Sequence, residues 1–287
     1  MSGQSLIFCV GAHKSGTSWL HGYLRRHGAC YFRNLKELHY FDTLDSGGSN
    51  WHQARQTKRL AGLHEKLANH PKAERNEWLP VLITDIEDWV AQFDGFHVDD
   101  AAYLDYIGFG RAESQVVGDI TPAYGQVSAD MLAHMAALGE DVKFIFLMRD
   151  PVERLWSHLR MISDLNGDEA LEQAVSEYLD DQHSSLTAMS DYQGTLERLL
   201  AVVPRARVHI ELFERLFSQE ALGRLCRFLG IESVPGEVER VVHKGRKIAL
   251  PDILRTRFEE KLAPQYQFVE EFMGGLPPEW TEKMVNA

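Results

Sequence analysis

One short segment constrains the fold of this chain more than any other. Residues 8–20 read FCVGAHKSGTSWL, an apolar run that passes through a turn of small residues into the start of a helix. Such a turn binds anions, because unpaired backbone N–H groups and the positive end of the helix dipole converge there. We therefore predict a strand, an anion-binding turn and a helix. The turn residues expected to hold the anion are Lys14, Ser15, Gly16, Thr17 and Ser18.

The lysine of this turn stands at an unusual place. In the phosphate-binding loop G-x-x-x-x-G-K-[ST] the lysine follows the second glycine, whereas Lys14 precedes Gly16. The turn is therefore related to that loop, but its lysine would approach the anion from the start of the loop.

Strand-like and helical patterns alternate along the chain. Apolar runs typical of strands buried on both faces occupy residues 5–12, 115–120, 142–149 and 206–212. Helical patterns lie between and after them, at residues 17–28, 129–139, 151–162 and 219–230. This alternation predicts one α/β domain over residues 1–287 with a mainly parallel central sheet. Residues 43–115 interrupt it and are interpreted as a mostly helical insertion, with helices at 51–70 and 84–93.

Composition argues against several classes of function. The 287 residues carry a formal net charge of -12, which argues against a nucleic-acid-binding protein. Cys9, Cys30 and Cys226 lie far apart and the histidines are scattered, so we expect neither a disulfide framework nor a metal site. No apolar run approaches the ~20 residues of a membrane span, so none is expected. The cysteine usage favours the reducing cytoplasm.

A second candidate anion site follows the third apolar run, in the segment VKFIFLMRDPVERLWSHLR at residues 142–160. Asp150 as cap and Pro151 as first helical residue predict a helix start. Arg149 would then lie at the carboxyl end of a parallel strand, where open α/β sheets bind ligands. Ser157, nearly two turns into the helix, could face the same anion. The alternative is a surface ion pair of Arg149 with Asp150 or Glu153.

These two segments resemble the signatures of the sulfotransferases that use 3′-phosphoadenosine 5′-phosphosulfate (PAPS). The family's 5′-phosphosulfate loop reads K-[ST]-G-T-[ST] and its 3′-phosphate motif R-D-P-x-x-R-x-x-S, and residues 14–18 and 149–157 match them. A turn at 244–246 is similar to the family's C-terminal K-G-R loop, which closes over the nucleotide. The resemblance assigns the 3′-phosphate to Arg149, Ser157, Lys244, Gly245 and Arg246, and the 5′-phosphosulfate to Lys14, Ser15, Gly16, Thr17 and Ser18.

The same resemblance implies a fold and a donor. The fold is a P-loop-like three-layer α/β/α sandwich with a mainly parallel sheet. The donor is PAPS, the product is adenosine 3′,5′-bisphosphate, and no metal is required. The chemistry is in-line transfer of a sulfuryl group to a hydroxyl or amine, with Lys14 stabilising charge on the bridging and equatorial oxygens.

Residues 34–43, NLKELHYFDT, resemble the K-E-x-H-[FY]-F-D motif of the Golgi heparan sulfate sulfotransferases, particularly the 3-O branch. In that branch the glutamate is assigned as the catalytic base, so the resemblance makes Glu37 the base. His39, and with less support His13, are the alternatives, because histidine has this role in the cytosolic branch. Otherwise Glu37 would only pair with Lys36 or Lys14 and order the site.

A further segment, GDITPAYG at residues 118–125, resembles the family's K-[ST]-P-A-Y segment but departs from it. Asp119 and Ile120 replace the usual acid–lysine pair, which argues against a heparan-like acceptor. We expect instead a small-molecule, lipid or carbohydrate acceptor, such as a neutral or cationic sugar, a lipid head group, a small alcohol or a carrier-tethered intermediate. Tyr124 would line the acceptor pocket or pack in the core.

The Golgi members carry a membrane anchor, and none is expected here, so the prediction is a cytoplasmic, bacterial-like enzyme whose 43–115 insertion lies near the acceptor site. Two alternatives stay open. One is an ATP-dependent kinase with a P-loop-like fold, for which Asp119 is the best candidate metal-binding aspartate. The other is a catalytically silent nucleotide-binding protein.

Overall fold

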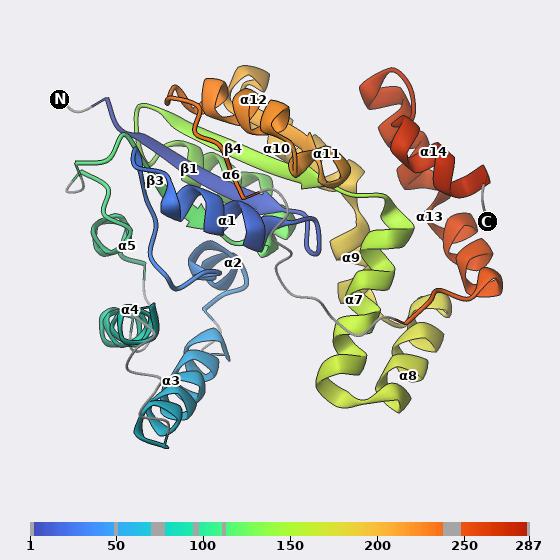
Figure 1. Cartoon of the computed structure of the whole chain (residues 1–287), viewed down its shortest axis with the longest axis horizontal. Helices are drawn as coiled ribbons and strands as arrows, with labels where there is room; N and C mark the ends of the chain where they lie inside the picture. The colour runs from blue at the N-terminus through green and yellow to red at the C-terminus, as the bar shows by residue number, and fades with distance from the viewer. Residues whose placement is uncertain are drawn as a thin grey trace.

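The computed structural model of the chain describes residues 3–48, 51–69, 78–93, 98–110, 113–237 and 248–285. Within them, five parallel strands form one sheet in the order β2-β3-β1-β4-β5 (Figure 1). The strands are β1 (Ser5–Gly11), β2 (Cys30–Tyr31), β3 (Val116–Ile120), β4 (Val142–Met148) and β5 (Val208–Leu212). The four predicted apolar runs form β1, β3, β4 and β5, and β1 lies between β3 and β4.

The central strand β1 explains why helices cover both faces of the sheet. All seven of its residues are buried, and successive side chains of a strand point to opposite faces. Leu6, Phe8 and Val10 pack into one apolar cluster, and Ile7 and Cys9 pack into a second. The predicted three-layer α/β/α arrangement with a mainly parallel sheet is therefore confirmed.

The helices divide between these two layers. The second cluster is completed by α1 (Thr17–Arg26), α11 (Phe213–Leu216) and α12 (Gln219–Leu229). The first cluster takes side chains from α2 (Tyr40–Asp45), α4 (Trp78–Gln92), α5 (Asp100–Tyr106), the 3-10 turn η2 (Pro122–Gln126), α6 (Ala129–Ala136), α7 (Pro151–Asn166), α8 (Asp168–Leu179), α9 (Ser184–Ser190), α10 (Tyr192–Val202), α13 (Asp252–Met273) and α14 (Pro278–Val285). The remaining elements are α3 (Trp51–Asn69) and the 3-10 turn η3 (Arg205–Arg207).

The start of α7 follows from its first residues, as predicted. The Asp150 carboxylate accepts a hydrogen bond from the backbone N–H of Glu153 at 2.8 Å, and Pro151 takes the first helical position. A capping aspartate and a proline with no N–H to satisfy both favour a helix start. The cap fixes the end of β4 next to the first turn of α7, which is where Arg149 lies.

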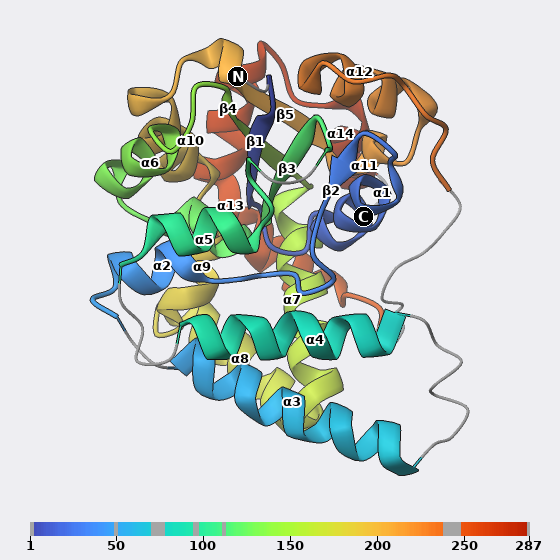
Figure 2. The same cartoon turned by 90° about the vertical axis from the view of Figure 1, so that its left-hand side faces the viewer.

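Residues 43–115 hold α3, α4 and α5 in the part of the chain that is described. Leucines of α3 pack against Leu79 and Ile83 of α4, so these two helices form a pair with its own small apolar cluster. Figure 2 shows this pair, together with α7 and α8, beyond the carboxyl ends of the strands. No helix among the described residues has the length and apolar character that crossing a membrane requires.

Candidate active site

The turn between β1 and α1 has the backbone of an anion cradle. Lys14 (φ 65°) and Gly16 (φ 89°) both adopt the left-handed conformation. A Cβ on Gly16 would lie 2.7 Å from Leu216 Cδ2, so glycine is required there. The Ser15 hydroxyl is fully buried, and no described residue hydrogen-bonds to it. A buried, orphaned hydroxyl at a helix N-terminus fits a bound phosphosulfate group.

The ammonium group of Lys14 has no ion-pair partner among the described residues. Its Nζ lies 3.5 Å from Met161 Sδ on α7. Burial lowers the pKa of Lys14, and the guanidinium of Arg149 lowers it further. An anion placed between these two cations would relieve both the desolvation and the repulsion.

The first helical turn of α1 supplies Thr17 and Ser18, the other two residues predicted to hold the anion. Thr17 is buried, and its hydroxyl accepts a hydrogen bond from Lys36 Nζ at 3.2 Å. Ser18 is half-buried beside it. The bond from Lys36 joins the anion cradle to the segment that carries Glu37.

Arg149 leaves the carboxyl end of β4 and turns toward the cradle. Its Nη1 donates to the backbone carbonyl of Lys14 at 3.2 Å, and its guanidinium lies 4.3 Å from the centre of the Phe213 ring. Burial lowers the pKa of Arg149, and its Nε is buried with no hydrogen-bond partner in the described structure. The alternative ion pair with Glu153 is present but long, at 3.8 Å, and Glu153 also pairs with Arg255 at 3.0 Å.

The other predicted 3′-phosphate residues are placed only in part. Ser157 is half-buried on α7, and its hydroxyl makes no hydrogen bond to another described residue. Lys244, Gly245 and Arg246 lie outside the described residues. The described part of the proposed 3′-phosphate site therefore consists of Arg149 and Ser157.

A third cation near the cradle was missed at the level of sequence. Arg160, on α7, contributes to lowering the pKa of both Lys14 and Arg149, so its charge lies near theirs. The spacing R-x-x-S-x-x-R at 154, 157 and 160 could have revealed it. The described structure thus places the charges of Arg149, Arg160 and Lys36 near Lys14, in a chain of negative net charge.

The segment with Glu37 and His39 is held by a hydrogen-bond hub at the end of β3. The buried Asp119 carboxylate accepts from the hydroxyls of Thr121 at 2.8 Å and Tyr124 at 2.6 Å. These two hydroxyl oxygens in turn accept from the backbone N–H groups of Leu38 at 3.0 Å and Tyr40 at 3.1 Å.

This hub indicates the roles of two residues, Asp119 and Tyr124, for which alternatives were open. The hydroxyl of Tyr103 makes a third bond to Asp119, at 3.1 Å, so the carboxylate points into the core rather than toward the cradle. Asp119 therefore has a structural role and lacks the placement of a metal-binding aspartate beside Lys14. Tyr124 is fully buried, so it packs in the core and does not line a pocket.

Glu37 and His39 stand on a strained backbone. Both have left-handed φ angles, 63° and 57°, which non-glycine residues seldom adopt. Among the described residues, the non-glycine positions with positive φ are Lys14, Glu37, His39 and Asp181. Three of these four are the candidate catalytic residues, and such strain concentrates at functional sites.

Glu37 forms an ion pair, and its lowered pKa makes it a weak base. Its Oε1 lies 2.5 Å from Lys36 Nζ. Burial alone would raise the pKa of Glu37, but the charge and hydrogen bond of Lys36 outweigh it, with help from His13 and His39, and lower it to about 2. The Glu37 carboxylate also raises the pKa of Lys14, so the two predicted catalytic groups are electrostatic neighbours.

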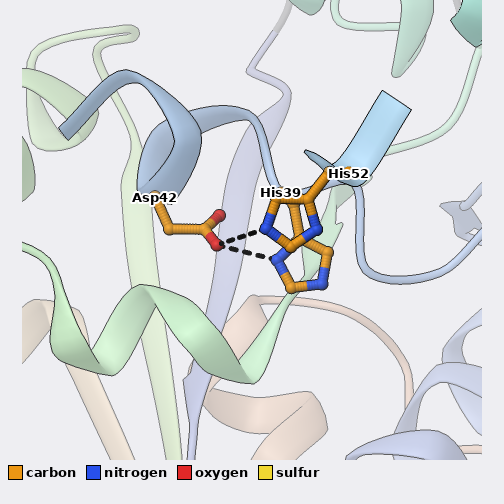
Figure 3. Close-up of side chains that lie close together, drawn as sticks. All are labelled: His39, Asp42 and His52. Carbon is orange, nitrogen blue, oxygen red and sulfur yellow. Dashed lines mark hydrogen bonds and ion pairs between the residues drawn. The ribbon is translucent and has the colours of Figure 1, made fainter. Parts of the chain in front are cut away.

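His39 belongs to a cluster with Asp42 and His52, shown in Figure 3. Asp42 Oδ2 lies 2.8 Å from His39 Nδ1 and 3.4 Å from His52 Nε2. The two rings are stacked, with centroids 3.7 Å apart and planes inclined by 13°. Burial would raise the pKa of Asp42, but the two histidine hydrogen bonds lower it to about 2. Asp42 is therefore an acceptor, and Nδ1 of His39 carries the hydrogen.

These three side chains are also the group that could hold a metal ion in the described structure, since their ligand atoms lie within 4.8 Å of one another. Metal binding requires that the in-plane lone pairs of both imidazoles converge on one point. Rings stacked 3.7 Å apart do not aim their nitrogens in that way. The arrangement fits two N–H donors on one carboxylate oxygen better than a metal centre. No sequence motif indicates this cluster, because His52 comes from the insertion.

His13, the third candidate base, lies close to the anion cradle. Burial lowers the pKa of His13 to about 4, so its imidazole is neutral at pH 7. His158 on α7 lies nearby, with ring centroids 6.4 Å apart, and burial lowers its pKa to about 3. Both rings are uncharged neighbours of the cationic cradle.

Comparisons with known proteins identify the family of this chain and structures that share its fold. A model of the sulfotransferase family matches residues 6–235. No curated protein matches the sequence. The crystal structure of a sulfotransferase from Alicyclobacillus acidocaldarius is 20% identical, with a TM-score of 0.65 over 96% of this chain and 98% of that one.

Two further solved structures are more distant. The sulfotransferase domain of the Synechococcus PCC 7002 olefin synthase is 20% identical, with a TM-score of 0.47 over 92% of this chain and 94% of that one. The sulfotransferase domain of the curacin biosynthetic pathway has the same identity and TM-score over 96% and 99%. The likeness to the Alicyclobacillus enzyme shows a shared fold, and the match to the family model covers most of the chain without singling out the heparan sulfate branch. The chain belongs to the sulfotransferase family.

Proposed function

We propose that this protein transfers a sulfuryl group from PAPS to a hydroxyl or amine of a small-molecule, lipid or carbohydrate acceptor. The observation that carries the proposal is the meeting of Lys14, Arg149 and the orphaned Ser15 hydroxyl at one anion cradle. The sulfotransferase family generally uses this donor, which supports the same assignment.

The donor site is proposed as two connected parts. Lys14, Ser15, Gly16, Thr17 and Ser18 hold the 5′-phosphosulfate, because backbone amides, hydroxyls and an unpaired ammonium converge there. Arg149 and Ser157 hold the 3′-phosphate, together with Lys244, Gly245 and Arg246 on the evidence of their sequence motif. Arg160 adds positive charge close to both parts.

The proposed reaction is an in-line displacement. The donor supplies the sulfuryl group: a bond forms between its sulfur and the acceptor oxygen, the bond from sulfur to the bridging oxygen breaks, and adenosine 3′,5′-bisphosphate leaves. Lys14 stabilises the charge that develops on the bridging and equatorial oxygens. Sulfuryl transfer resembles phosphoryl transfer, in which positioning and charge stabilisation supply most of the rate enhancement.

Of the three candidate bases, Glu37, His39 and His13, the described structure favours His39. A general base works best when its pKa lies near the working pH, and the pKa values of Glu37 and His13 are lowered to about 2 and about 4. His39 donates from Nδ1 to Asp42, which leaves Nε2 as the proton acceptor, as in an Asp–His dyad. We therefore propose that His39 takes the acceptor proton and that Glu37 holds Lys36 and Lys14 in place.

A thermal-shift comparison tests the donor. Adenosine 3′,5′-bisphosphate at about 100 times its Kd should stabilise the protein by roughly 2.7 kcal/mol, whereas ATP with Mg²⁺ should stabilise it much less. Arg149→Gln should weaken the effect. A matched control is Arg207→Gln, which removes the same charge beside the amino end of β5, whereas Arg149 follows the carboxyl end of the neighbouring parallel strand β4.

The outcomes separate the three candidate functions. Stabilisation by ATP with Mg²⁺ but not by the bisphosphate would support the kinase and contradict the proposal. Tight bisphosphate binding without transfer to any acceptor in a broad panel would support a catalytically silent protein.

A further inference from the structure

One face of α3 is turned toward the proposed catalytic residues. His52, Arg55, Gln56 and Arg59 are spaced i, i+3, i+4 and i+7, so they share a helix face. His52 fixes where this face points, because it stacks on His39 and lies 3.4 Å from Asp42 (Figure 3). Gln56, one turn further on, is buried against the protein.

The two arginines of this face, Arg55 and Arg59, form no ion pair with a carboxylate within the described ranges. The Arg59 guanidinium donates a long hydrogen bond to the Gln56 side-chain oxygen, at 3.5 Å. Arg55 lies 5.5 Å from the centre of the Trp51 ring, whose residue is 59% exposed. Two arginines without acids, in a chain with net charge -12, are left available to an external anion.

The distance from these arginines to the proposed base follows from helix geometry. At about 1.5 Å of rise per residue, Arg55 and Arg59 lie roughly 5 and 10 Å along the axis from His52. Burial lowers the pKa of Arg59 and the charge of Arg55 lowers it further, while the carboxylate of Glu37 acts in the opposite direction. Arg59 is therefore within electrostatic range of the catalytic segment.

We propose that this face of α3 recognises the acceptor, and that the acceptor carries an anionic group, a carboxylate or a phosphate ester, roughly 5–10 Å from the hydroxyl that is sulfated. The inference rests on the proposed function. Arg55 and Arg59 bind the anionic group, and the exposed Trp51 ring beside Arg55 offers a flat surface for the body of the molecule.

Charge complementarity supports an anionic rather than a neutral acceptor. The chain as a whole repels anions, so an anionic acceptor needs a local positive surface to reach the site. The cations of the cradle are assigned to the donor. The α3 arginines lie on another element, and Figure 1 shows α3 standing apart from α7, which carries Arg160. The expectation of a neutral or cationic acceptor rested on the net charge and on Asp119 and Ile120, and this local placement of arginines opposes it.

The test uses matched acceptor pairs that differ in charge. With PAPS as donor, 4-hydroxyphenylacetate is compared with its methyl ester, and glucose 6-phosphate with glucose, with sulfated product measured by mass spectrometry. At least one anionic member should have a kcat/KM about tenfold or more above its neutral partner, the size of one good charged contact. The carboxylate and phosphate pairs separate the two kinds of anion.

Variants tie the preference to α3. Arg55→Gln/Arg59→Gln should raise KM for the preferred anion about tenfold, with kcat within about twofold, and should leave the neutral partner unaffected. The matched control Lys58→Gln/Lys66→Gln also removes two positive charges from α3. Lys58 lies off the His52 face, and Lys66 lies far from His52 along the helix, so this variant should change neither KM nor kcat.

The results distinguish this inference from the donor proposal. Equal turnover of charged and neutral members, failure of every anionic member, or an unchanged preference in the arginine double variant overturns the α3 assignment while bisphosphate binding stays intact. Loss of bisphosphate binding in the unmodified protein would instead overturn the proposed donor.

Discussion

Arg149 donates a hydrogen bond to the backbone carbonyl of Lys14 at 3.2 Å, so the carboxyl end of β4 and the turn after β1 are joined directly. These residues are 135 positions apart in the chain. Their contact brings the two proposed phosphate sites together without a ligand, which reduces the reorganisation needed when a doubly phosphorylated nucleotide binds.

Lys14 and Arg149 should therefore have separable effects. Lys14→Ala should lower kcat by roughly 10²–10³, the cost of one positioned donor to developing charge. Its effect on bisphosphate affinity should be smaller, because that product lacks the equatorial sulfuryl oxygens and keeps only the bridging oxygen on its 5′-phosphate. Arg149→Ala should instead weaken bisphosphate binding about tenfold or more. Calorimetry and initial rates measure the two quantities. Near-normal turnover of Lys14→Ala would contradict its proposed role.

The identity of the base can be decided by two substitutions. His39→Asn should reduce kcat by roughly 10²–10⁴, because the proton acceptor is gone. Asparagine is chosen since it tolerates left-handed backbone. Glu37→Gln should reduce kcat less, because it weakens the charge beside Lys36 and Lys14 but leaves the proton acceptor in place. Initial rates of the two variants at saturating donor measure the difference. If Glu37→Gln is the inactive variant and His39→Asn keeps most of its turnover, the base is Glu37.

A substitution in the hub at Asp119 should disturb the segment that carries Glu37 and His39 and leave nucleotide affinity unchanged. Thr121→Val removes the oxygen that accepts from the Leu38 N–H, so it should cost about 1–2 kcal/mol of unfolding free energy. It should lower kcat while bisphosphate affinity stays constant, since the cradle is untouched. Urea titration, rates and calorimetry on the same preparation check this. An equal loss of nucleotide affinity would show that the hub supports the whole fold rather than this segment.

Stability should fall in mild acid because of buried histidines. Burial lowers the pKa of four imidazoles to about 4 or below, at His13, His21, His158 and His209. Below the unfolded value of 6.5, the unfolded chain binds protons that the folded chain excludes. The free energy of unfolding should therefore decrease as pH falls from 6.5 toward about 4, by at most ~1.4 kcal/mol per pH unit for each histidine.

His209 offers a control for this prediction outside the proposed site. It lies on β5, and its charged neighbours are Glu211, Arg224 and Arg205. His209→Gln cannot take up the proton, so urea titrations between pH 7 and pH 4.5 should show a shallower slope than the parent protein. A parent stability that is independent of pH over this range would contradict the buried-neutral assignment.

The sequence predicted the fold where local patterns and packing agree. Continuous apolar runs, typical of strands buried on both faces, predicted β1, β3, β4 and β5, and Asp150–Pro151 predicted the start of α7. The edge strand β2 was missed, because two residues, Cys30 and Tyr31, carry no periodicity. Its pairing with β3 is decided by tertiary contacts alone.

The candidate site was predictable in its motifs and not in its geometry. The cradle and the Glu37–His39 segment follow from residue types and spacing. The stack of His39 on His52 and the proximity of Arg160 to Lys14 depend on how separate elements pack. Asp119 was a candidate metal-binding residue by position, but the three hydroxyls that surround it come from η2, α5 and the end of β3. No local pattern encodes such an environment.

The left-handed backbone at Glu37 and His39 has a consequence for descent. Each such residue lowers the free energy of unfolding by about 1 kcal/mol or more. We expect selection to keep this strain only where the two side chains contribute to catalysis. Relatives of this chain that no longer transfer sulfuryl groups should have glycine or asparagine at these two positions, and they should have a higher melting temperature. Relatives that retain the activity should keep glutamate and histidine there.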